Sequence, residues 1–449
     1  MGRFALCCLL LMTTPAPLPA TEPGSDAWAA KMWDAYITGH AANGDFSGNV
    51  LVSRRGRSIY EKSAGSASRT FDVPNRPDTR FLVASVTKTF TAAGIAVLAG
   101  DKRLKITDGL DLYLPELAAA KQIKLWHLLA HQSGLDNPDY EAIAARSVSP
   151  DDLLAMIGGK PLLFEPGSDS RYSNAGYVTL ARVIEKVSGR PFEEFLKERI
   201  FSPLGMADSG TLRSGDIIPR LAEGYIPGSG TGFLRPQPRD PSSLFGSGNI
   251  YSTASDLDRW LTAIDRHELF DISKQEYPFG WGKRFWFDKQ VLVQSGVTNG
   301  YSSVILTVPA EELHIVVLMN TQSGFTSDEG KSLLGIATGQ AAPVPARRGF
   351  PPAVPRGVLE RYAGLYLWGE PKIPMHIETD GRGLTLRWAD SASVVPLTAL
   401  SETEFEDRSS FGRIRFQGEG LVWTQNGEDT SAPRSRAESG SDSPSRPCP

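Results

Sequence analysis

The chain has 449 residues, of which 41% are hydrophobic, so it can bury a large core and is expected to divide into more than one domain. Its formal net charge is −4, and acidic and basic residues are mixed along the sequence. This balance, with no long basic run, excludes nucleic acid as an expected partner.

The first 20 residues have the pattern of an export signal. Arg3 supplies a positive charge, residues 4–12 are an unbroken apolar run, and small residues lead up to Ala20, where we expect cleavage. The run is too short to span a bilayer, and no later segment reaches the roughly 18 apolar residues that a spanning helix needs. We therefore expect a periplasmic or extracellular protein without a transmembrane span.

The cysteines fit an exported protein that is stabilised by packing. Cys7 and Cys8 lie inside the signal and leave with it, so the mature chain keeps only Cys448. A single thiol near the C-terminus leaves no internal disulfide.

The next elements alternate between helix and strand. Ser25 is a good N-cap for a helix whose apolar positions recur at helical spacing. Residues 48–65 follow as a hairpin with its turn at Arg55-Gly56. Residues 81–100 open a second helix, and the middle of the chain to about residue 206 is mostly helical by its periodicity.

Residues 283–320 return to strand patterning. Four apolar-rich runs are separated by turn residues at 288–289, 298–300 and 310–312, which is typical of an antiparallel meander. Strands before and after the helical region predict one sheet built from both ends of the segment, with an all-helical insertion. This organisation is α/β.

The last third of the chain divides further. Residues 340–357 are proline-rich, and their apolar residues recur with neither the helical nor the strand period. We therefore expect them to form a linker after a main domain of residues 21–339. Residues 358–427 contain short strands and turn residues, which predict a small all-β sandwich or barrel. The remaining residues 428–449 are rich in Ser and Pro, and we expect a disordered tail.

Ser85 and Lys88 form the first candidate for chemistry. They are spaced i, i+3 at the start of a helix, so their side chains lie on one face. Free N–H groups and the helix dipole favour developing negative charge at that end. A lysine in an apolar setting loses hydration, its pKa falls, and it can accept the serine proton. Alone, the same spacing also suits the solvent-facing start of an ordinary core helix.

Two further segments carry suitable side chains. Tyr172 and Asn174 stand between a turn and a helix, where a tyrosine can relay a proton and an Asn can bind a substrate amide. The alternative is a helix N-cap beside a core tyrosine. Later, a strand ends in Gln294-Ser295-Gly296, and the N–H of Val297 could point at an oxyanion. An ordinary glycine-containing turn explains that segment equally well.

Together and in this order, the three segments resemble the serine β-lactamase and penicillin-binding-protein family, with its S-x-x-K, Y-x-N and K-T-G or H-x-G motifs. Intervening segments add to the resemblance, which covers about residues 25–335: "WHLLAHQSGL", "IFSPLGMADSG" and "GNIYSTASDLDRWL". The resemblance implies an α/β sandwich of antiparallel sheet and flanking helices plus an all-helical subdomain, with the active site between them. "LERYAGLY" resembles the start of the small β-barrel that some relatives carry.

The resemblance also implies residue roles and a serine acyl-enzyme mechanism without metal or cofactor. Ser85 would be the nucleophile, Lys88 its activator and Tyr172 the general acid/base. Asn174 would contact the substrate amide, together with the strand Gln294-Ser295-Gly296. The N–H groups of Ser85 and Val297 would form the oxyanion hole.

Gln294 departs from the family pattern, which has Lys or His at this position. A neutral amide offers no charge to a substrate carboxylate, and losing a charge-assisted partner typically costs about 1.5–3 kcal/mol. This departure argues against an efficient β-lactamase and favours substrates that are neutral or held differently.

His127 and His131 have the i, i+4 spacing of helical metal ligands. Leu128, however, stands where a metalloprotease has its Glu, so we expect these histidines to be structural and the chain to hold no metal.

The function expected from the sequence is an exported serine hydrolase acting through an acyl-Ser85 intermediate on an ester or amide. Its partner would be a small molecule or short peptide, cell-wall fragments included. Two alternatives stay open: a class C-like β-lactamase, and a non-catalytic peptidoglycan- or ligand-binding homologue that keeps the pocket without turnover.

Overall fold

The computed structural model describes residues 22–435, apart from residues 229, 231, 275–276, 278, 325–326, 390–393 and 426–427. The expected export signal and Cys448 lie outside the described residues. Within the described part of the chain, no helix is both long enough and apolar enough to cross a membrane.

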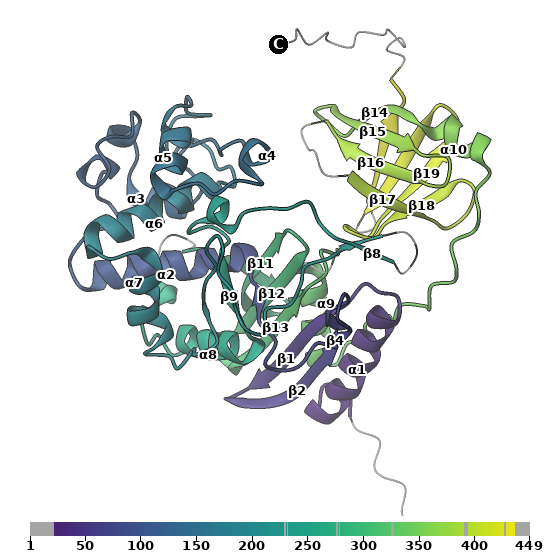
Figure 1. Ribbon diagram of the computed structural model, residues 1–449. Coiled ribbons are helices and arrows are strands. Elements are labelled where there is room, and N and C mark those ends of the chain that lie inside the picture. The colour runs from purple at the N-terminus through teal and green to yellow at the C-terminus, as the bar shows by residue number, and fades with distance from the viewer. Residues whose placement is uncertain are drawn as a thin grey trace, which may run out of the picture.

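A six-stranded antiparallel sheet forms the centre of the main domain, with the strand order β10-β11-β12-β13-β1-β2 (Figure 1). Its strands are β1 (Gly48–Arg54), β2 (Arg57–Ala64), β10 (Gly282–Trp286), β11 (Lys289–Thr298), β12 (Tyr301–Val308) and β13 (Leu313–Met319). Strand β1 pairs with β13, with Gly48 opposite Met319 and Arg54 opposite Leu313. The N-terminal hairpin and the late meander therefore share one sheet, as the sequence predicted.

Helices cover both faces of this sheet. Helices α1 (Asp26–Ala42) and α9 (Ser327–Ala337) pack on one face, where Trp33 and Leu333 join a core with Val50 and Val52 of β1. Leu51, between those two valines, belongs to the opposite core with α8 (Ala254–Asp265). The alternation arises because successive strand residues point to opposite faces.

Local sequence signals account for several element boundaries. The Ser25 hydroxyl accepts a hydrogen bond from the N–H of Trp28, which confirms the predicted N-cap. Arg55 and Gly56 have φ angles of 52° and 72°, as a tight hairpin turn requires, and confirm the predicted turn. The turn between β10 and β11 is at residues 287–288, one residue earlier than expected, since Lys289 already begins β11.

The helical subdomain lies beside the sheet domain, at the left of Figure 1. Its main helices are α2 (Thr87–Gly100), α3 (Leu125–Leu129), α4 (Tyr140–Ile143), α5 (Pro150–Gly158), α6 (Asn174–Ser188) and α7 (Phe192–Leu196). Gly94 of α2 allows close packing on α6, because a Cβ there would lie only 2.7 Å from the Cδ1 of Ile184. Helix α2, which carries Lys88, is thereby fixed against α6, which begins at Asn174.

Short strands connect the two parts. They are β3 (Ser66–Ser68) with β4 (Val73–Pro74), β5 (Phe81–Leu82) with β9 (Ile250–Ser252) and β6 (Gly210–Thr211), and β7 (Ile226–Pro227) with β8 (Phe233–Leu234). Pairing of β5 with β9 sets the chain direction just before Ser85.

Residues 338–355 contain no helix or strand, and α10 (Arg356–Tyr362) begins the small β domain. Eight antiparallel strands follow in sequence order: β14 (Gly364–Trp368), β15 (Ile373–Thr379), β16 (Leu384–Trp388), β17 (Val394–Ala399), β18 (Glu404–Asp407), β19 (Gly412–Gln417), β20 (Gly420–Gln425) and β21 (Glu428–Pro433). A bridge between Tyr366 and Arg434 brings the first and last strands together, so the sheet is a nearly closed barrel.

The prediction of a disordered tail from residue 428 onward was wrong for residues 428–433. Strand β21 pairs along its length with β20, and Ala432 is completely buried in the barrel core. The sequence did not indicate this strand because its residues are polar and show little alternation between polar and apolar positions. The strand is held by hydrogen bonds to its neighbour β20. Residues 436–449 lie outside the described residues.

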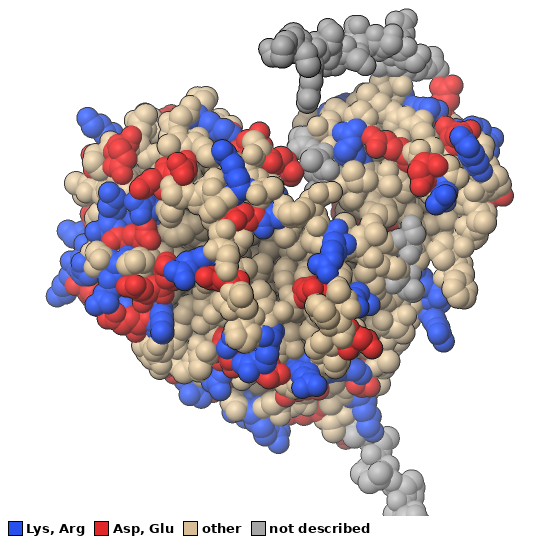
Figure 2. Space-filling model, in the orientation of Figure 1, with Lys and Arg blue, Asp and Glu red and all other residues tan. Residues whose placement is uncertain are grey.

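Charges of both signs are intermixed over the face shown in Figure 2, without a dominant patch of one sign. The helical subdomain and the barrel stand apart as two lobes above the sheet in Figure 1.

Candidate active site

Ser85 lies in a short 3-10 turn (Ala84–Val86) that leads directly into α2. The residue before it, Ala84, has a φ of 48°, an unusual conformation for a residue with a Cβ and one that often marks functional sites. The Ser85 Oγ is 2.7 Å from the hydroxyl of Tyr172, and it accepts a hydrogen bond of 3.1 Å from the Nζ of Lys88. Three side chains that the sequence predicted separately are therefore in direct contact.

Lys88 is completely buried, yet it has no counter-ion. Its Nζ donates to the main-chain oxygen of Ser247 at 2.8 Å. Among the described residues, no carboxylate lies within ion-pair distance of it. Burial without a compensating charge lowers the pKa of Lys88 from 10.5 to about 7. A substantial fraction of this amine is therefore neutral near pH 7 and can accept a proton from Ser85.

Tyr172 differs from Lys88 in its proton affinity. Although the residue is 51% exposed, its hydroxyl end is enclosed beside Ser85, and this burial raises the pKa of Tyr172, an effect only partly opposed by the hydrogen bond from Ser85. The phenol is therefore protonated at neutral pH. Of the two groups that touch Ser85, Lys88 is the one that can act as the first proton acceptor, and Tyr172 can donate.

The histidines predicted to be structural have structural contacts. The Nδ1 of His131 accepts a hydrogen bond from the Ser173 N–H at 3.1 Å, and its ring lies 4.7 Å from that of Tyr172. Burial, with help from the Lys88 charge, lowers the pKa of His131 to about 4, so its ring is neutral and can accept. The Nδ1 of His127 accepts from the Lys124 N–H at 3.0 Å. No group of three potential metal ligands occurs among the described residues.

Asn174 begins α6, and the Ser173 hydroxyl caps that helix by accepting from the Gly176 N–H. The N-cap predicted for this segment is therefore confirmed, and it fixes the helix start at Asn174, two positions after Tyr172. The Asn174 side chain lies near the Tyr140 hydroxyl, close enough to lower the pKa of that group, although burial raises it overall.

Sequence reasoning missed two groups of the site, Tyr140 and Ser247. The Tyr140 hydroxyl is buried and has no hydrogen-bond partner of standard geometry among the described residues. It comes from α4 and is not part of any motif. Ser247 contributes a main-chain oxygen, and a main-chain atom leaves no signature in residue identity. The neighbouring glycines of "FGSGN" are the one sequence signal that could have indicated a close approach of the backbone here.

The end of β11 lies against the start of α2. The Nε2 of Gln294 donates to the main-chain oxygen of Ser85 at 3.2 Å. A Cβ on Gly296 would lie 2.6 Å from the Ser85 nitrogen, so only glycine permits this approach. Val297 follows and is 45% exposed, while Ser295 faces Val304 in the β11–β12 ladder. The expected strand therefore borders Ser85, but the Gln294 amide donates its hydrogen bond to the main chain of the protein.

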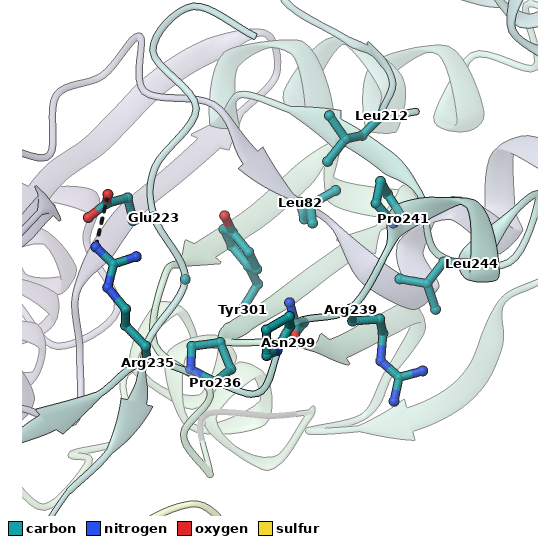
Figure 3. A pocket seen from close by; sticks show the side chains of 12 residues that line it. Leu82, Leu212, Glu223, Arg235, Pro236, Arg239, Pro241, Leu244, Asn299 and Tyr301 are labelled. Carbon is teal, nitrogen blue, oxygen red and sulfur yellow. Dashed lines mark hydrogen bonds and ion pairs between the residues drawn. The ribbon is translucent and has the colours of Figure 1, made fainter. Parts of the chain in front are cut away.

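A pocket of about 380 Å³ is lined by residues that lie close in sequence to this cluster, although Ser85, Lys88 and Tyr172 themselves are not among its lining residues (Figure 3). Two of its lining residues, Leu82 and Leu244, stand three positions before Ser85 and Ser247, and both of these serines contact Lys88. A third lining residue, Asn299, follows β11 directly. The wall is mainly apolar, with Leu82, Leu212, Pro236, Pro241, Leu244 and Tyr301. On its rim, Arg235 reaches toward Glu223, and the two pair at 3.3 Å (Figure 3).

Comparison with known proteins supports the same family. The model of the Beta-lactamase family matches residues 33–339. A penicillin-binding protein of Bacillus subtilis (strain 168) is 28% identical over 414 residues, which cover 83% of this chain and 90% of that protein. The teichoic acid D-alanine hydrolase of Staphylococcus aureus is 27% identical over 288 residues, covering 61% of this chain and 70% of the hydrolase.

Among solved structures, the octameric penicillin-binding protein homologue from Pyrococcus abyssi superposes with a TM-score of 0.61 at 22% identity. The match covers 90% of this chain and 99% of the homologue, so it shows a shared fold. The chain belongs to the Beta-lactamase family and is a serine hydrolase related to the β-lactamases and penicillin-binding proteins.

Proposed function

We propose that this member of the β-lactamase family is an exported hydrolase that cleaves esters or amides of D-amino acids through an acyl-Ser85 intermediate. The observation that carries the proposal is the buried amine of Lys88, which lies 3.1 Å from the Ser85 Oγ and has no carboxylate of the described residues beside it. Such an amine is a base at neutral pH, and a serine hydroxyl needs one to become a nucleophile.

In the acylation step, neutral Lys88 takes the Ser85 proton while the Oγ attacks the substrate carbonyl carbon. The carbonyl oxygen becomes an oxyanion held by the N–H groups of Ser85 and Val297. Tyr172, still protonated and 2.7 Å from the Oγ, donates its proton to the leaving alcohol or amine as the bond to it breaks. Tyr172 is then reprotonated from the Lys88 ammonium.

In deacylation, a water molecule takes the place of the leaving group. Tyr172 and Lys88 remove one of its protons, the hydroxide attacks the acyl carbon, and the Ser85–acyl bond breaks. The proton returns to the Ser85 Oγ, and the free acid leaves. The hydrogen bond from Gln294 to the Ser85 carbonyl holds the main chain of the nucleophile during both steps.

Three features support D-amino-acid esters or amides as substrates. The matched relative from Staphylococcus aureus is named for D-alanine hydrolysis. The pocket whose wall leads to Ser247 is mainly apolar, so it suits a small side chain more than a charged group. Gln294 supplies no cation for the carboxylate that β-lactams and C-terminal D-alanine peptides carry, and in this proposal Asn174 binds the amide or amine of an aminoacyl group.

Export is part of the proposal and rests on the pattern of residues 1–20. An enzyme outside the cytoplasm would meet cell-wall polymers and their D-alanine groups. The test of this part is the N-terminal residue of the mature protein recovered from the producing cell. Recovery of mature chain starting at residue 21 supports export, and an intact Met1 in the cytoplasmic fraction contradicts it.

The function is tested on purified mature protein, with Ser85→Ala as the matched control. D-alanine p-nitroanilide, its L-enantiomer, p-nitrophenyl acetate and a chromogenic cephalosporin are compared at equal concentration. We expect ester and D-anilide cleavage, little cephalosporin turnover, and loss of all activity in Ser85→Ala. Cephalosporin turnover faster than ester cleavage contradicts the proposed substrate class. Absence of a covalent adduct on Ser85 with every compound contradicts the mechanism.

A further inference from the structure

We propose that the C-terminal barrel is part of the substrate site, and that Arg408 is the positioning residue through which it acts. Arg408 follows β18 and holds the β7–β8 hairpin of the main domain, whose continuation forms one wall of the 380 Å³ pocket and then reaches Ser247, the partner of Lys88. The inference rests on the proposed function for its substrates, and it adds a determinant of which substrates the pocket accepts.

The contacts of Arg408 join three parts of the chain. Its side chain is fully buried. Nη1 donates to the main-chain oxygens of Gly228 and Gly232 at 3.0 and 3.1 Å. Nη2 donates to the Gly44 oxygen at 2.7 Å, and Nε donates to the Asp45 carboxylate at 3.3 Å. The guanidinium therefore ties both sides of the hairpin loop to the end of α1.

Thr398 is a second residue of the barrel that contacts the same hairpin. The N–H of Gly230, at the tip between β7 and β8, donates to the Thr398 Oγ1 of β17 at 3.2 Å. The ring of Phe233 in β8 contacts two guanidinium groups, those of Arg69 and Arg408, at 3.4 Å and 5.7 Å from its centroid. Each of these contacts fixes the hairpin and leaves the catalytic residues untouched.

The hairpin continues directly into the pocket wall. Residues 235–244 follow β8, and six of them line the pocket: Arg235, Pro236, Pro238, Arg239, Pro241 and Leu244. Three of these are prolines, which stiffen the segment because their φ angles are fixed. Three residues further on, Ser247 accepts the hydrogen bond from Lys88. The wall is thus held at one end by the barrel and at the other by the catalytic lysine.

Arg348 provides a matched control within the same interface. Its Nη1 donates to the Asp45 carboxylate at 2.6 Å, and its Nε donates to Glu406 of the barrel at 2.8 Å. It shares Asp45 with Arg408 and also bridges the barrel to the main domain, but none of its hydrogen bonds to the described residues goes to the hairpin. Loss of Arg348 therefore weakens the interface without releasing the pocket wall.

The test compares Arg408→Met, Thr398→Val and Arg348→Met in the full mature chain. The substrates are p-nitrophenyl acetate, which needs little more than Ser85, and D-phenylalanine p-nitroanilide, which must fill the pocket. We expect Arg408→Met and Thr398→Val to raise KM for the anilide about tenfold and about threefold, with kcat for the acetate within about twofold of wild type. Arg348→Met is expected to leave the ratio of the two kcat/KM values unchanged.

Two results overturn the inference: folded Arg408→Met and Thr398→Val that both keep the wild-type ratio, or an equal change of the ratio in Arg348→Met. If Arg408→Met does not fold, the nearly isosteric Thr398→Val decides. If the wild type cleaves neither substrate, the proposed function fails, and amide hydrogen exchange then tests the inference separately. Exchange in residues 226–244 must be faster in Arg408→Met and Thr398→Val than in Arg348→Met, and equal rates contradict the positioning role.

Discussion

The active site buries the amine of Lys88, and the interface between α8 and the central sheet buries the imidazole of His314. The surroundings lower the pKa of the lysine but raise the pKa of the histidine. Lys88 has a serine hydroxyl and a main-chain oxygen beside it, and burial lowers its pKa to about 7. His314 of β13 is also buried, with Asp258 2.8 Å from its Nδ1 and Asp265 3.0 Å from its Nε2. Burial alone would lower the pKa of His314, but the two carboxylates raise it to about 9.

Counter-ions, more than burial, thus decide which of the two groups is charged. A buried cation with two carboxylates stays protonated and ties α8 to the sheet. A buried amine without one gives up its proton and becomes available for chemistry. The following experiments break or sharpen this contrast, from the largest expected effect to the smallest.

Replacing Lys88 by Arg retains the charge and removes the base. Because a guanidinium does not deprotonate in proteins, we expect kcat/KM for ester hydrolysis to fall by about 10²–10⁴-fold. Steady-state kinetics at pH 7 and 8 measure the loss, and circular dichroism verifies folding. Activity within about threefold of wild type in a folded Lys88→Arg variant would mean that another group accepts the Ser85 proton.

Replacing Asp265 by Asn removes one of the two carboxylates that pair with His314. The side chain is 3% exposed, so the variant leaves a buried imidazolium with one carboxylate. We expect the free energy of unfolding to fall by about 3–5 kcal/mol, the usual result of removing one partner of a buried ion pair.

Urea denaturation measures the change, and Asp258→Asn is the matched control, because Asp258 is 22% exposed and its loss is expected to cost less. The folded fraction of Asp265→Asn should keep wild-type kcat/KM. Equal losses in the two variants, or no loss in either, would remove the stabilising role given to the buried carboxylate.

The two groups also predict opposite pH dependences of stability. Lys88 has a pKa of about 7 in the folded chain and 10.5 in its unperturbed state, so its contribution to stability rises with pH between these values. His314 has a raised pKa, about 9 against 6.5, so its contribution is fully present below about 6.5 and is lost as the pH rises through about 9. In the wild type the two slopes oppose each other.

The Lys88→Met substitution removes the contribution of Lys88 to the pH dependence of stability. We expect its free energy of unfolding to fall by about 3 kcal/mol between pH 6.5 and 9, because only the His314 term remains. The wild type should change less over the same range. Urea denaturation at several pH values gives both profiles, and parallel profiles for the two proteins would contradict one of the two pKa directions.

The smallest expected effect concerns Tyr140. Its hydroxyl is buried near Asn174 and has no hydrogen-bond partner of standard geometry among the described residues, so it can donate to a bound substrate. Tyr140→Phe is expected to lower kcat/KM for D-alanine p-nitroanilide about fivefold, the effect of one hydrogen bond, and to leave stability unchanged or slightly higher. Unaltered kinetics together with a lower melting temperature would assign the hydroxyl a purely structural role.

The sequence predicted the parts of the molecule that depend on local pattern. The N-cap at Ser25, the turn at Arg55-Gly56 and the sheet built from two distant segments all follow from spacing and turn chemistry. Ser85, Lys88 and Tyr172 were recognisable because each stands in a motif, and the fold brings them within hydrogen-bond distance.

The remaining features depend on groups that are distant in sequence. The oxygen of Ser247 that holds Lys88 is a main-chain atom, so no residue type marks it. Tyr140 resembles any tyrosine in a short helix, and only the fold shows that its buried hydroxyl has no partner of standard geometry in the described part of the chain. Strand β21 is polar, and its pairing with β20 could not be inferred from composition. Arg408 in sequence is one more charged residue after a strand, and only the docked hairpin reveals its contacts.

The central claim is that Lys88, made partly neutral by burial, activates Ser85 for acylation. The most direct measurement is the rate at which Ser85 becomes acylated by p-nitrophenyl acetate between pH 5 and 9, followed by intact-protein mass spectrometry, with Ser85→Ala as a blank. The account predicts a single adduct on Ser85 whose rate of formation rises through an apparent pKa of about 7. A rate that rises only above pH 9, or an adduct that also forms on Ser85→Ala, would contradict it.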